Sequence, residues 1–82
     1  MDRSSDEIYV LYQMGASEEW TWFSVVGAFF SEDALRGYAR EKGISVGPTV
    51  EPSGRNEVVL KEPQEFVAVR SKEGPVPDVE LA

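Results

Sequence analysis

The stretch "GAFFSEDALRGYAREKG", residues 27–43, decides the fold because one strand ends and a helix begins within it. Ser31 suits the N-cap, where a side-chain oxygen accepts a hydrogen bond from a backbone N–H of the first turn. Gly43 suits the left-handed position that follows a helix. Apolar side chains recur at helical spacing between these ends: Leu35, Tyr38 and Ala39. The stretch therefore predicts a helix over residues 32–42 and not a chemical site.

Two strands are predicted before this helix. Residues 20–30, "WTWFSVVGAFF", are rich in β-branched and aromatic residues, and Gly27 within them indicates a bulge. Residues 7–14, "EIYVLYQM", are apolar on both alternating sets, which is typical of a strand in the middle of a sheet. The short polar loop 15–19 predicts that the two strands form a hairpin.

Two further strands are predicted after the helix, at residues 57–61 and 65–71. A short edge strand over residues 44–50 is also considered, because Pro48 lacks the N–H that a central strand would need. The last stretch, residues 72–82, has two prolines, and its apolar residues show neither helical nor strand periodicity over the stretch as a whole. It is therefore expected to be a flexible tail.

These elements predict the α+β class: a small antiparallel sheet of about four strands with one helix packed on a face, in the order β-β-α-β-β. The chain has 82 residues, so a single small core is expected. Residues 1–6 are expected to be disordered, residues 7–71 to form the single domain, and residues 72–82 to form the tail.

Composition excludes several kinds of chemistry. The sequence contains no cysteine and no histidine, so thiolate nucleophiles, disulfides and the commonest transition-metal ligands are missing. We expect no metal site and no cofactor. Neither a signal peptide nor a membrane-spanning segment is predicted, so we expect a cytoplasmic protein that does not enter a membrane.

Part of the chain resembles a diffuse group of small uncharacterised proteins of bacteriophages and bacteria. The matching residues lie in the first half of the sequence: Tyr9 to Tyr12, Gly27 to Phe30, and Ser31 to Ala34. Trp20 and Trp22 depart from the plainer second strand of that group. The resemblance implies a small accessory protein of the phage type and carries over no catalytic residue.

An enzyme without histidine or cysteine needs other groups, and paired carboxylates are one choice. The candidate acids are Glu18 and Glu19 in the predicted loop, and Glu32 and Asp33 in the first helical turn. Neighbours on one element do not face each other across a substrate. We therefore expect no catalytic residue and no enzyme.

The tryptophans are the strongest candidates for binding. Trp20 and Trp22 are expected on one strand face, either in the core or in an exposed patch that binds a partner. Glu18 and Glu19 lie beside them and complete the candidate partner-binding set. Stacking of RNA bases on these aromatics is also considered, but the net charge of −7 opposes direct binding of nucleic acid.

The leading hypothesis is a non-enzymatic protein-binding module that engages a host protein, with acidic residues favouring a basic partner. One alternative is a nucleic-acid mimic that occupies the basic groove of a host enzyme acting on DNA or RNA. Another is a structural homo-oligomer built through an exposed strand edge.

Overall fold

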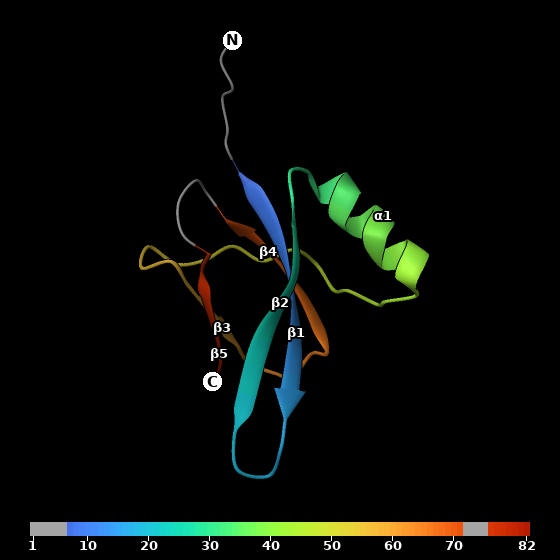
Figure 1. Ribbon diagram of the computed structural model, residues 1–82. Coiled ribbons are helices and arrows are strands. Elements are labelled where there is room, and N and C mark those ends of the chain that lie inside the picture. The colour runs from blue at the N-terminus through green and yellow to red at the C-terminus, as the bar shows by residue number, and fades with distance from the viewer. Residues whose placement is uncertain (1–6, 72–75) are drawn as a thin grey trace.

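The computed structural model describes residues 7–71 and 76–82. In this part of the chain five strands and one helix follow each other in the order β-β-α-β-β-β (Figure 1). Their bounds are β1 Ile8–Ala16, β2 Thr21–Phe29, α1 Glu32–Lys42, β3 Glu57–Leu60, β4 Phe66–Ser71 and β5 Asp78–Leu81. The α+β class and the helix on one face of a sheet are confirmed.

The main sheet has three antiparallel strands in the order β2-β1-β4. Strand β1 is central because both of its alternating sets are apolar and each can be buried on its own side of the sheet. The predicted hairpin of β1 and β2 forms. Its register shifts where Leu11 pairs with Gly27 and Tyr12 pairs with Val25, so Val26 is the extra residue of a bulge beside Gly27.

Helix α1 begins and ends as its sequence predicts. The Ser31 hydroxyl oxygen accepts a hydrogen bond of 3.1 Å from the N–H of Ala34. Gly43 has a φ of 72°, the left-handed conformation that glycine adopts without strain. Leu35 is fully buried and packs with Leu11 of β1 and Ala68 of β4. This cluster holds the helix against one face of the main sheet.

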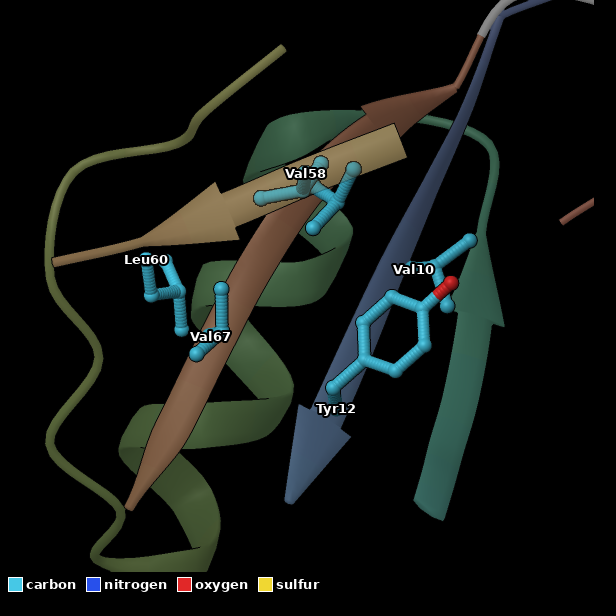
Figure 2. Close-up of a cluster of buried hydrophobic side chains, with 6 residues drawn as sticks. Val10, Tyr12, Val58, Leu60 and Val67 are labelled. Atoms are coloured by element: carbon cyan, nitrogen blue, oxygen red, sulfur yellow. The ribbon is translucent and has the colours of Figure 1, made fainter. Parts of the chain in front are cut away.

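The other face of the main sheet is covered by a second, two-stranded sheet. Strands β3 and β5 pair in parallel, and Val58 and Leu60 of β3 belong to one buried cluster with Val67 of β4 (Figure 2). The same cluster includes Val10 and Tyr12 of β1. The structure therefore has three layers: helix, main sheet and small sheet.

Three expectations are corrected here. A single sheet of about four strands does not form, because residues 57–60 pair with the C-terminal segment and leave the main sheet with three strands. Residues 44–50 make only one bridge, between Val50 and Val69. The tail is structured at its end, since residues 78–81 form β5 and belong to the domain. The expected disorder of residues 1–6 and mobility of residues 72–75 lie outside the described residues.

Candidate functional site

The turn of the β1–β2 hairpin presents the first three candidate residues. The Ser17 side-chain oxygen accepts hydrogen bonds of 3.3 Å from the N–H groups of Glu19 and Trp20, and the Ser17 N–H donates to the Trp20 carbonyl at 2.8 Å. This local bonding closes the turn with a serine side chain. Glu18, Glu19 and Trp20 are all exposed, and Trp20 keeps 62% of its surface accessible. Trp20 lies in the turn, one residue before the strand in which it was expected.

Trp22 is also exposed, with 48% of its surface accessible, so the core alternative for the two tryptophans is wrong. It lies opposite Gly15 in the hairpin register. A Cβ atom at Gly15 would lie only 2.2 Å from Cζ2 and 2.3 Å from Cε2 of Trp22. The indole therefore packs directly on the Gly15 backbone. About half of the Trp22 surface is covered by this packing and its surroundings, and the other half is open to solvent.

Trp22 borders a groove between β2 and the C-terminal segment, which we call the hairpin groove. Its volume is about 540 Å³. The walls are three consecutive residues of the hairpin and five consecutive residues near the C-terminus, with one tyrosine from β1: Thr21, Trp22, Phe23, Val76, Pro77, Asp78, Val79, Glu80 and Tyr12. The groove thus follows two extended backbones.

Tyr12 ties the two walls of the hairpin groove together. Its buried hydroxyl donates a 2.6 Å hydrogen bond to the carbonyl of Pro77, 65 residues further along the chain. Burial, and next the negative charge of Asp78, raise the pKa of Tyr12 to about 12. The phenol therefore stays protonated at neutral pH and remains a hydrogen-bond donor.

Sequence reasoning missed Tyr12 and the C-terminal wall because residues 72–82 were assigned to a mobile tail. A usable signal was present in "DVEL", where polar and apolar residues alternate as they do in a half-buried strand. The structure shows the same alternation, with Asp78 and Glu80 exposed and Val79 and Leu81 half-buried.

The charges around the hairpin groove have one sign. Asp78 and Glu80 stand exposed on one wall, and the lining residues include no lysine or arginine. Glu18 and Glu19 lie in the adjoining turn. Together with the net charge of −7, these four carboxylates make this end of the molecule a negative surface.

A second groove, of about 340 Å³, lies where α1 meets residues 48–51. Arg36 of α1 donates hydrogen bonds to the carbonyls of Val46 at 3.1 Å and Gly47 at 2.8 Å, and to Thr49 at 3.0 Å. The Thr49 hydroxyl donates to Glu32 at 2.6 Å, and this bond is the largest factor that lowers the pKa of that carboxyl, ahead of Arg36. This network fastens the chain after the helix.

The same groove contains two ion pairs, one between Arg36 and Glu32 at 3.4 Å and one between Arg70 and Glu51. Its two arginines and two glutamates therefore balance in charge. The Arg36 guanidinium holds the protein's own backbone and a carboxylate, and Arg70 pairs with Glu51, although the buried Arg70 Nε has no hydrogen-bond partner in the described part of the chain. We interpret this groove as structural, and the hairpin groove as the better candidate for a binding site.

The acids considered for catalysis stay on separate elements. Glu18 and Glu19 are in the hairpin turn, whereas Glu32 and Asp33 are in the first turn of α1. Over residues 7–71 and 76–82, no three acidic residues gather as a cation would require. No further chemical role emerges from their positions.

Within the described part of the chain, no helix has the length and apolar character needed to cross a membrane. Comparison of the chain with protein-family models, with curated proteins and with solved structures found no match. The resemblance to small phage proteins therefore stays a prediction, and the functional interpretation depends on the geometry of the hairpin groove.

Proposed function

We propose that this protein is a non-enzymatic binding module that engages a basic partner protein through the hairpin groove and its two tryptophans. The observation that carries the proposal is the pair of exposed indoles, Trp20 and Trp22, beside a groove whose charged residues are all acidic. Tryptophan is enriched among the residues that dominate the energy of protein interfaces.

The packing of Trp22 favours a binding role. Because one side of its indole lies against Gly15, the side chain has less rotational freedom to lose when a partner covers the other side. Burying half of a tryptophan side chain removes roughly 100 Å² from water, or about 2.5 kcal/mol. Trp20 adds a second aromatic surface next to it.

The acidic residues of this surface supply orientation and association rate. Carboxylates at the turn and on the C-terminal wall, from Glu18 to Glu80, attract a positively charged surface and repel an acidic one. The phage-type resemblance of the first half of the chain adds the proposal that the partner is a host protein. The molecule would act by covering a functional surface of that partner.

Affinity capture tests the proposal. The folded protein is used as bait in a bacterial lysate at low and high salt, beside a Trp20→Ala/Trp22→Ala variant and a Phe30→Ala/Val59→Ala control. Phe30 and Val59 are large, exposed apolar residues outside the hairpin groove, with 89% and 55% of their surfaces accessible. Circular dichroism first checks that each variant is folded.

We expect a partner that the wild type and the control retain and the tryptophan variant loses, with partial retention at high salt because burial of apolar surface is not screened. Nucleic-acid mimicry would be favoured instead if the wild type lost the partner completely at high salt and the tryptophan variant retained it as well as the wild type at low salt. Failure to retain any partner would overturn the proposal.

A further inference from the structure

The outer edge of β2 is open in the described part of the chain. Strand β2 is at the end of the order β2-β1-β4 and pairs only with β1 there. The opposite edge of the main sheet, on β4, is partly covered: the Val50 N–H donates to the Ala68 carbonyl at 2.9 Å, and the Arg70 N–H donates to the Val50 carbonyl at 2.8 Å. In Figure 1 the lower part of the hairpin reaches beyond the end of α1.

The chemistry of this edge is unusual for a solvent-exposed strand. Natural proteins protect free edges with charged side chains, proline, bulges or short length. Strand β2 has nine residues, "TWFSVVGAF", with neither a charge nor a proline, and its protection is the bulge at Val26. The stretch from Thr21 to Val25 therefore offers a regular row of unpaired backbone groups.

The hairpin groove runs along this row. Side chains of consecutive strand residues point to opposite faces, so a groove on one face would collect every second residue. Thr21, Trp22 and Phe23 all border the groove, which places it beside the strand edge. The opposite wall is likewise a continuous extended segment, residues 76–80.

The acidic wall identifies the occupant. Asp78 and Glu80 are both exposed on β5 and are two residues apart, so their side chains share one face and stand roughly 6.5 Å from each other. An incoming strand has the same spacing between every second residue. Lysine or arginine at alternate positions would therefore pair with both carboxylates. The residues between them lie on the other face of the added strand, where they pack toward Trp22.

We propose that the hairpin groove receives an extended basic segment of the partner, which pairs with the free edge of β2 as a fourth strand of the main sheet. This inference rests on the proposed function and specifies its partner: a strand with basic residues at alternate positions. A second copy of this chain fits less well, because Thr21–Phe29 has no basic residue to meet Asp78 and Glu80 and each copy carries a net charge of −7.

Synthetic ten-residue peptides test strand addition to the full chain. The probe alternates lysine and valine, and a control has the same composition with five lysines followed by five valines. Two further probes carry N-methyl groups on the backbone of either the lysines or the valines, which removes hydrogen-bond donors from one edge of the peptide and keeps its charge. Affinity is followed by tryptophan fluorescence, and pairing by hydrogen exchange of backbone amides.

We expect the alternating peptide to bind at least tenfold more tightly than the control peptide of five lysines followed by five valines. We also expect it to slow the hydrogen exchange of the backbone amides in Thr21–Val25. Of the two N-methylated peptides, one should bind at least tenfold more weakly than the unmethylated alternating peptide, and the other should bind as well as it does. The reason is that only one edge of the peptide faces β2. Equal binding by both N-methylated peptides, or unchanged exchange in β2, would overturn strand addition while the capture experiment could still support a binding module.

A charge test uses matched variants. Asp78→Asn/Glu80→Gln should weaken the alternating peptide at least fivefold, whereas Glu41→Gln/Glu62→Gln, which removes two exposed acids outside the groove, should change its affinity less than twofold. Equal losses in both pairs would show attraction by net charge alone and overturn the assigned site. Protection of β2 amides without peptide, increasing with protein concentration, would assign the edge to self-association and also overturn the proposal.

Discussion

Gly15→Ala tests whether the Trp22 indole packs on the hairpin backbone as the structure shows. The new Cβ atom would lie 2.2 Å from Cζ2 and 2.7 Å from Nε1 of Trp22, well inside van der Waals contact. The indole is a side chain with solvent beside it, so we expect it to swing away and leave the strand pairing intact. Gly15 has no positive φ, so alanine introduces no backbone strain.

The change in the free energy of unfolding caused by Gly15→Ala is the difference between two effects: exposure of the Trp22 indole and restriction of the unfolded chain. Trp22 is 48% exposed, so about half of its side chain, roughly 100 Å², is covered, and exposing it costs about 2.5 kcal/mol at most. Replacing glycine by alanine restricts the unfolded chain and returns about 0.4–1 kcal/mol. We therefore expect a net loss of about 1–2 kcal/mol in the free energy of unfolding.

Urea unfolding measures this loss, and a Trp20→Phe background makes Trp22 the single tryptophan, whose emission is excited selectively over that of the tyrosines. We expect a lower urea midpoint with an unchanged slope, and a red shift of the native emission as the indole becomes more solvated. Gly37→Ala is the matched control, because nothing lies within 4 Å of its new Cβ. In the middle of a helix that change should stabilise by about 0.5–1 kcal/mol. An unchanged emission maximum and a raised midpoint in Gly15→Ala would refute the packing of Trp22 on Gly15.

Three further changes test other parts of the fold. Tyr12→Phe should destabilise by about 1–2 kcal/mol, because the buried Pro77 carbonyl loses its donor, and urea unfolding measures this. Burial raises the folded-state pKa of Tyr12 to about 12, so the unfolded chain loses this proton at lower pH than the folded protein does. The free energy of unfolding of the wild type should therefore fall between pH 10 and 12, by up to about 1.4 kcal/mol per pH unit from this group. The same fall in a pH series of Tyr12→Phe would contradict this assignment. Arg36→Lys should lose the bonds to residues 46–49, destabilise by about 1–2 kcal/mol and speed amide exchange there; unchanged exchange would contradict the network. Deletion of residues 78–82 should cost about 2–3 kcal/mol in thermal unfolding, since two half-buried side chains of β5 leave the core, and a mobile tail would predict no loss.

The helix and the hairpin could be predicted from local patterns. Ser31 and Gly43 each have a specific role at a helix end, and the apolar pattern on both faces of β1 places that strand in the middle of the sheet. These features depend on neighbours in sequence or on burial alone, which is why the residues themselves carry the signal.

The second sheet could not be predicted in the same way. The parallel pairing of β3 with β5 brings Val58 beside Val79, and no short-range pattern specifies which strand a distant strand will join. The hairpin groove depends on this pairing, since it is the position of β5 that brings Pro77 to the Tyr12 hydroxyl. Candidate residues on the hairpin were therefore accessible from sequence, whereas their opposite wall was not.

An open, uncharged strand edge raises the question of what would keep two copies of the free protein from pairing with each other. The four carboxylates around the groove give an answer, because two copies that approach edge to edge each carry Glu18, Glu19, Asp78 and Glu80, so two negatively charged surfaces approach each other. Neutralising all four with Gln and Asn should therefore favour dimers, and high salt should do the same to the wild type by screening. Sedimentation equilibrium at low and high salt measures both effects.

The control for that measurement neutralises an equal number of exposed acids outside the groove, at Asp33, Glu41, Glu62 and Glu65. If repulsion at the groove protects the edge, the groove variant should associate at concentrations at which this control is still monomeric. Equal association by both variants would mean that the total charge keeps the chains apart, and that the acids of the groove have no particular relation to the β2 edge. A basic strand differs from a second copy because its lysines and arginines are attracted by the same carboxylates that repel an acidic chain. This attraction acts beside the unpaired backbone of the β2 edge.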